Sequence, residues 1–196
     1  MKKIILDLCG ATGAWSKPYV DNGYDVEIVT LPYCDVRKYI PPDNVYGILA
    51  APPCTHFSLA RTTAKTPRDF NSAMEIVSAC LKIIWGCRAS GSLKFWALEN
   101  PMGYLRQFLG RPVLTFNPCD YGDGYTKKTD LWGFYNLPKT NKVKLNEQQA
   151  RDCSINSRVL PKIPENFIIP IGQKRQAVRR AITPVGFARA FYKANK

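Results

Sequence analysis

The chain has 196 residues, enough for one domain with a hydrophobic core but too few for two ordinary domains. Its composition, with 45% hydrophobic and 22% charged residues, is typical of a soluble globular protein. No apolar run is long enough to span a bilayer, and Asp7 comes too early for a secretory signal. These features exclude membrane and secreted classes, and we expect a cytoplasmic protein.

The charge balance is strongly basic, since 28 Lys and Arg residues against 15 Asp and Glu give a formal net charge of +13. The excess is greatest from residue 161 onward, where eight basic side chains accompany one acid. A domain of this kind attracts polyanions, of which nucleic acid is the commonest. The alternative is a protein that is basic without binding nucleic acid.

The chain has seven cysteines and one histidine, His56, and these numbers limit the kinds of metal, disulfide and catalytic sites that it can form. No two cysteines form a Cys-x-x-Cys pair, so we expect reduced thiols, no disulfide scaffold and no metal site. His56 lies two residues after Cys54, which leaves a Cys-His hydrolase open as an alternative.

The predicted elements alternate between strands and helices along the chain. Apolar runs predict strands over residues 3–8, 25–30, 47–51, 94–98, 113–116 and 130–135. Helical spacing or capping residues predict helices over 14–22, from an N-cap at Thr66 to about 87, over 102–109 and over 184–194. This order indicates an α/β fold, Rossmann-like, with a mostly parallel sheet covered on both faces. Residues 137–172 show no firm periodicity.

Ligands of open parallel sheets bind beyond the carboxyl ends of the strands, and three such ends here carry unusual residues. Residues 7–15 form a glycine-rich turn, although an ordinary strand-to-helix loop would look the same. At residues 51–58, two prolines hold Cys54 in a stiff loop, and the nearby cations Arg61 and Lys65 are expected to lower the pKa of its thiol. The third end places an acid, Glu99, after an apolar strand, where it could carry a proton.

Taken in this order, the three segments resemble the cytosine-5 DNA methyltransferase family, most closely its short phage-type members. Residues 52–58 (Pro-Pro-Cys-x-x-Phe-Ser) match the family's nucleophile loop, and residues 99–101 (Glu-Asn-Pro) stand for its Glu-Asn-Val. Residues 7–13 stand at the S-adenosylmethionine loop, and residues 183–188 (Thr-Pro-x-Gly-Phe-Ala) resemble the helix that packs back on the cofactor site.

The resemblance implies one methyltransferase domain over residues 1–196, with 137–172 as a reduced recognition or loop region. Residues 173–196 would form a basic segment and a helix that closes the cofactor site. Its location would be the cytoplasm of a bacterial or phage-infected cell. The short recognition region leaves open a recognition partner or an oligomer.

The resemblance also implies roles for individual residues. Cys54 is the expected nucleophile and Glu99 the partner of cytosine N3. S-adenosylmethionine is the expected cofactor, bound by Leu8, Cys9, Gly10, Thr12, Gly13, Ala14, Trp15, Thr30, Asp35, Pro52 and Thr183. The expected partner is DNA, of undetermined strand state, bound by Ser58, Arg61, Lys65, Lys127, Lys128, Lys174 and Arg175.

The sequence departs from the family pattern at several positions. Cys9 replaces a phenylalanine, Ala14 a glycine, and Thr30 the acid expected at the cofactor ribose. Lysines at 127 and 128 stand where the family has Gln-x-Arg-x-Arg. Three alternatives therefore stay open: an RNA cytosine methyltransferase, an inactive nucleic-acid-binding relative, and an enzyme that transfers another group from a modified cofactor.

Overall fold

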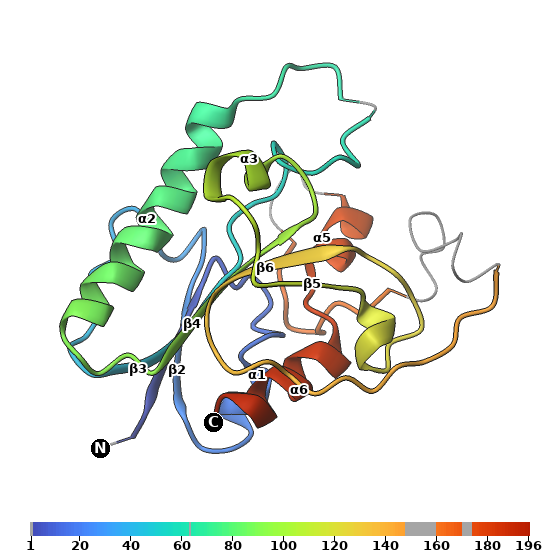
Figure 1. Ribbon diagram of the computed structural model, residues 1–196. Coiled ribbons are helices and arrows are strands. Elements are labelled where there is room, and N and C mark those ends of the chain that lie inside the picture. The colour runs from blue at the N-terminus through green and yellow to red at the C-terminus, as the bar shows by residue number, and fades with distance from the viewer. Residues whose placement is uncertain (1, 63, 148–159, 170–173) are drawn as a thin grey trace.

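The computed structural model describes residues 2–62, 64–147, 160–169 and 174–196. These residues build a sheet of six strands in the order β2-β1-β3-β4-β6-β5. β1 to β4 are mutually parallel, β6 runs antiparallel to β4, and β5 runs antiparallel to β6, so five strands share one direction. The expected α/β class and mostly parallel sheet are thereby confirmed (Figure 1). The strands are β1 Ile4–Leu8, β2 Asp25–Val29, β3 Val45–Ala50, β4 Phe95–Pro101, β5 Leu114–Phe116 and β6 Thr129–Phe134.

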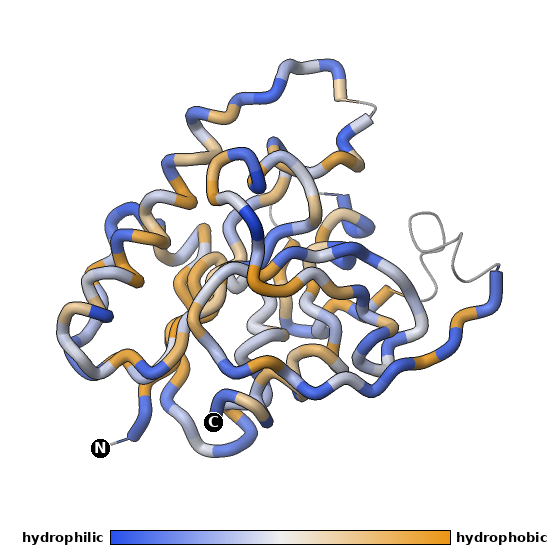
Figure 2. Tube along the Cα trace, viewed as in Figure 1, coloured by the Kyte–Doolittle hydropathy of each residue, from blue (hydrophilic) through white to orange (hydrophobic). Residues whose placement is uncertain are grey.

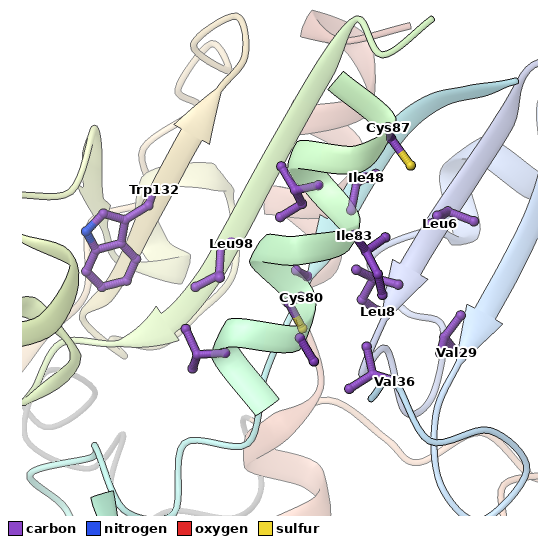
Figure 3. Close-up of a cluster of buried hydrophobic side chains, with 14 of the residues drawn as sticks. Leu6, Leu8, Val29, Val36, Ile48, Cys80, Ile83, Cys87, Leu98 and Trp132 are labelled. Atoms are coloured by element: carbon purple, nitrogen blue, oxygen red, sulfur yellow. The ribbon is translucent and has the colours of Figure 1, made fainter. Parts of the chain in front are cut away.

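One face of the sheet is covered by α2 (Phe70–Ala89), whose apolar side chains recur at helical spacing. Val77, Cys80 and Ile84 are fully buried against strand residues such as Leu6 and Leu98. Figure 3 shows this arrangement, with Cys80, Ile83 and Cys87 of the helix directed at the strands. The short helix α3 (Leu105–Leu109) joins the same cluster through the buried Leu105.

The opposite face is packed by aromatic residues from α6 (Val185–Ala194) and from the turn that leads into α1 (Lys17–Val20). Phe187 is fully buried, stacks on Phe116 with ring centroids 4.0 Å apart, and lies 6.0 Å from Trp15. Large buried aromatic surfaces contribute strongly to stability. This packing joins the last helix to the loop after β1. Figure 2 shows that hydrophobic segments concentrate in the central strands.

Several predicted boundaries are wrong. The long helix is capped by Asp69 rather than Thr66, because the Asp69 carboxylate accepts a hydrogen bond from the Ser72 amide. The strand predicted to stop at residue 98 continues to Pro101, which pairs with Thr129. Proline has no amide N–H, and it is tolerated here because it is the last residue of the strand. The first helix is only a four-residue piece.

Two elements were not predicted: a 3-10 turn η1 (Pro118–Tyr121) and α5 (Arg175–Ala181), a polar helix in which only Val178 is buried. The predicted strands otherwise agree with those observed to within two residues at each end. The expected recognition region, 137–172, lies partly outside the described residues. Among the described helices, none has the length and apolar character to cross a membrane.

Candidate active site

A pocket opens at the carboxyl edge of the sheet, where β1, β3 and β4 end. Its wall combines three segments that are far apart in the chain: the turn after β1, the Pro-Pro loop after β3, and the end of β4. Residues from the approach to β6 and from the segment between α5 and α6 complete it. The lining residues are Asp7, Cys9, Gly10, Ala11, Thr12, Trp15, Ala51, Pro52, Pro53, Cys54, Glu99, Pro101, Lys127, Ala181 and Thr183.

The turn after β1 is held in an unusual backbone conformation. Cys9 and Ala11 have φ values of 59° and 44°, in the left-handed region that residues other than glycine rarely adopt. Such conformations carry strain and gather at functional loops. Gly10 is required for a different reason, since a Cβ there would lie 2.2 Å from the Asp7 carboxyl carbon. The turn is therefore shaped around the Asp7 side chain.

Asp7 is a fully buried acid within an otherwise apolar strand. Its Oδ2 accepts a hydrogen bond of 2.5 Å from the Ser16 hydroxyl, whereas its Oδ1 has no hydrogen-bond partner. Burial raises the pKa of Asp7 to about 6, against the opposing effect of Ser16. The Trp15 indole nitrogen, in the same pocket wall, is likewise buried without a partner. Orphaned buried polar groups are costly, so both are candidates for ligand contacts.

The Cys54 loop is fixed by contacts on both sides. Asn100, fully buried on β4, donates a hydrogen bond of 2.9 Å from Nδ2 to the carbonyl of Pro52. The amides of Phe57 and Ser58 both donate to the Cys54 carbonyl, which closes a tight turn. Phe57 is fully buried among aromatic rings. The segment is therefore held by hydrogen bonds on both sides of Cys54.

The charged groups that face the Cys54 thiol are Glu99 and Lys127. The Lys127 Nζ lies 3.6 Å from Glu99 Oε1, and both side chains are mostly buried. The pKa of the Cys54 thiol is raised, because burial outweighs the lowering effect of Lys127, and Glu99 raises it further. The expectation that Arg61 and Lys65 would lower this pKa is therefore wrong. Arg61 instead donates to Thr66 Oγ1 and the Pro67 carbonyl.

The pocket brings together many of the predicted site residues: Cys9, Gly10, Thr12, Trp15, Pro52, Cys54, Glu99 and Thr183. Other predicted cofactor residues do not line it, namely Leu8, Gly13, Ala14, Thr30 and Asp35. Leu8 is buried in the core cluster. The Asp35 carboxylate is bound by the Arg37 guanidinium, which lowers the pKa of Asp35 to about 2.

The residues predicted to bind nucleic acid fall into two groups. Lys127 lies in the pocket wall beside Glu99 rather than on an open surface. Ser58 and Arg61 are half-buried in the loop after Cys54, and the exposed cations are Lys65, Lys128, Lys174 and Arg175. Lys174 and Arg175 begin the segment that ends at Ala181 in the pocket wall. Exposed cations thus occur on segments that lead to the pocket.

Sequence reasoning missed two features of the pocket. It did not assign a role to Asp7, although an acid inside an apolar run, followed three residues later by glycine, is a visible signal. It also placed Lys127 among phosphate-binding residues, because the proximity of Lys127 to Glu99 depends on the antiparallel pairing of β4 with β6.

His56 does not line the pocket. Its Nδ1 accepts a hydrogen bond of 2.7 Å from the Asp69 amide. The open alternative of a Cys-His hydrolase, which needs this imidazole beside Cys54, finds no support in that placement. Within the described residues there is also no cluster of three His, Cys, Asp or Glu side chains able to hold a metal ion.

Comparison with known proteins gives little further information. No family model and no curated protein matches the sequence. Among solved structures, one match is the crystal structure of a triple mutant of Spodoptera frugiperda DNMT2. The two share 15% sequence identity with a TM-score of 0.46, over 76% of this chain and 56% of that one. This chain thus spans little more than half the length of that protein.

Proposed function

We propose that the protein is an S-adenosylmethionine-dependent methyltransferase that modifies carbon 5 of cytosine in DNA through a covalent adduct with Cys54. The observation that carries this proposal is the meeting of Cys54, Glu99 and the turn after β1 in one pocket. These are the three segments whose order along the chain resembles the cytosine-5 DNA methyltransferase family.

The pocket wall fits a cofactor that bears positive charge and an amino-acid group. Asp7 offers a buried carboxylate oxygen without a partner, and Trp15 offers an unpaired N–H donor. Because position 10 is a glycine, no side chain there collides with the Asp7 carboxyl group. We infer that these residues, with Thr12 and Thr183, hold S-adenosylmethionine, which supplies an electrophilic methyl group when bound.

The catalytic pair would activate the base. Carbon 5 of cytosine is a poor nucleophile, and addition of the Cys54 thiolate to carbon 6 moves an electron pair onto carbon 5. Glu99, as an acid at N3, would stabilise the adduct by neutralising the charge that develops there. Lys127 would help to keep Cys54 as thiolate. After methyl transfer, loss of the carbon-5 proton to a base restores the double bond and expels the thiolate.

The target base must leave the helical stack, or already be unpaired, to reach a thiol held inside the pocket. The exposed cations Lys128, Lys174 and Arg175 would contact phosphates around it. The positive net charge supports DNA as the partner, and RNA offers the same phosphates and the same base. Both nucleic acids are therefore candidate substrates to be assayed.

The decisive experiment uses oligonucleotides that contain 5-fluorocytosine, because the fluorine cannot leave as a proton and the covalent adduct persists. The wild-type protein with S-adenosylmethionine should give a band that survives denaturing electrophoresis. Cys54→Ala should give none, whereas Cys34→Ala, at a free cysteine outside the pocket, should behave as wild type. DNA and RNA versions of the oligonucleotide separate the two substrates. An adduct that forms equally without Cys54 would overturn the mechanism.

A further inference from the structure

A small network of hydrogen bonds, which we term the His56 latch, connects the Cys54 loop to the start of α2. The Asp69 amide donates to His56 Nδ1 at 2.7 Å, and the Arg68 guanidinium donates to the His56 carbonyl, also at 2.7 Å. Because Nδ1 accepts, the proton of the neutral imidazole resides on Nε2. The latch therefore uses both the side chain and the backbone of the histidine.

Each partner of the latch is itself fixed. Asp69 caps α2, since its carboxylate accepts the Ser72 amide at 3.0 Å. The Arg68 guanidinium lies 4.8 Å from the centre of the Tyr104 ring, and the Tyr104 amide donates to the Phe57 carbonyl. The histidine is thus connected to two elements, α2 and the segment before α3, that do not move without disturbing the core.

The latch lies two residues from the nucleophile. His56 is inside the turn closed by the Cys54 carbonyl and the amides of Phe57 and Ser58. From the other side, Asn100 holds the carbonyl of Pro52. The segment from Pro52 to Ser58 is therefore held before Cys54 by β4 and after Cys54 by the latch.

We propose that His56 is a positioning residue. Through its hydrogen bond with the Asp69 amide, it holds Cys54 in the position that the reaction requires. Only the expected effect on kcat and KM rests on the proposed function; the expected effect on the exposure of Cys54 does not. Misplacement of a reacting group by about 1 Å can cost on the order of a hundredfold in rate, so loss of the latch should reduce kcat more than it changes KM. Because the latch also keeps Cys54 half-buried, its loss should make the thiol more reactive to a small alkylating agent.

The experiment compares three variants of the full chain. His56→Ala and His56→Phe remove the acceptor, and the second keeps a ring of similar size. His56→Asn keeps an acceptor at the δ1 position, so it is the conservative variant expected to restore wild-type behaviour. Hydrogen exchange of the amides of Phe57, Ser58 and Asp69 reports the latch directly. Alkylation of Cys54 by iodoacetamide, followed by peptide mass spectrometry, reports its exposure.

The expected result is faster exchange and faster Cys54 alkylation in His56→Ala and His56→Phe, with kcat lowered about tenfold to a hundredfold. S-adenosylhomocysteine affinity should stay unchanged, and His56→Asn should match wild type in every measurement. Equal alkylation and equal kcat across all four proteins would overturn the proposal, as would a defect in His56→Asn as large as that in His56→Ala. If the wild type methylates no cytosine, the proposed function fails, while exchange and alkylation still decide whether the latch holds Cys54.

Discussion

Two opposite charges face the Cys54 thiol, and they shift its pKa in opposite directions. Burial is the largest influence and raises the pKa, Lys127 lowers it, and Glu99 raises it. At neutral pH the ligand-free protein should therefore hold Cys54 mainly as the thiol. If Cys54 is the nucleophile, as proposed, it therefore has to lose its proton before it can react.

The pH dependence of Cys54 alkylation tests this balance. In the wild type, the rate should rise with pH to a midpoint above the ordinary pKa of a thiol, because burial raises the pKa of Cys54. Lys127→Met should move the midpoint to higher pH, and Glu99→Gln should move it lower, because each removes one of the two charges. Measurement at the single peptide that contains Cys54 avoids interference from the other cysteines. Midpoints that move in the same direction in both variants would contradict this account.

Burial of Asp7 makes the stability of the protein depend on pH. Its pKa in the folded protein is about 6, against an ordinary value of 3.8, so the folded state binds this proton more tightly than the unfolded chain does. Stability from this group is present in full below about pH 3.8 and is lost as the pH rises through 6. The loss corresponds to about 3 kcal/mol.

Urea denaturation of the wild type and Asp7→Asn at about pH 4 and about pH 7.5 measures this loss. Asparagine carries no charge, so the variant should lose less stability over this range, by about 2 kcal/mol. All other titrations are shared and cancel in the comparison. An identical change in both proteins would show that Asp7 ionises as easily inside the protein as outside it.

Individual residues of the pocket wall were predictable where a short motif marked them, and they were unpredictable where the pairing of distant strands placed them. Cys54 and Glu99 follow from local patterns, and the structure brings them into one pocket. Lys127 reaches Glu99 only because β6 runs antiparallel to β4, which no local pattern reveals. The same holds for Asn100, whose contact with the Pro52 carbonyl spans 48 positions in the chain.

The helix α6 depends on a residue from elsewhere in the chain for its N-terminal cap. The helix begins after Pro184, which offers no side-chain cap, and Asp123 supplies the missing acceptor. Its Oδ2 accepts the Gly186 amide at 3.0 Å, and the carboxylate also accepts the Phe187 amide. Thr183 of the pocket wall lies immediately before this helix. Capping of α6 and formation of the pocket are therefore linked.

Removal of the Asp123 carboxylate should destabilise both α6 and the pocket wall that precedes it. Asp123→Ala leaves two helix amides without an acceptor and should lower the free energy of unfolding by about 1–2 kcal/mol. Asp123→Asn keeps an oxygen acceptor and is the matched control, with a smaller loss. Urea denaturation measures the stability, and titration with S-adenosylhomocysteine should show weaker binding to Asp123→Ala. Full stability in the alanine variant would mean that water replaces the carboxylate.

The elements themselves were largely predictable, because apolar runs and helical spacing mark the strands and the helices α2 and α6. The start of α2 was misplaced because Thr66-Pro67 and Asp69 both satisfy helix-start preferences. Asp69 prevails through its contacts with Ser72 and with His56, of which the second is not local. α5 escaped prediction because it has a single buried side chain, Val178.

For the molecule as a whole, the net charge of +13 predicts binding to nucleic acid that weakens steeply with salt. Replacement of Lys174 or Arg175 by alanine should reduce the slope of log affinity against log salt by about one unit each. Arg88→Gln is the control, because Arg88 packs against Trp85 and Phe134 at the far end of β4 and β6. Fluorescence anisotropy over a salt series gives the slopes, and a slope unchanged in all three variants would remove these residues from the interface.

The aromatic packing of α6 has a consequence for synthesis of the protein. Phe187 and Phe191 fill the face of the sheet that also contains Trp15 and Phe116, and Asn195 donates to the Asn136 carbonyl. On the ribosome, residues 183–195 emerge after every other pocket residue has been made. Until then we expect the nascent chain to expose this aromatic surface, which is the kind of surface that chaperones bind. The surroundings of Cys54 and of the turn after β1 are therefore complete only once residues 183–195 have been made and have folded onto the sheet.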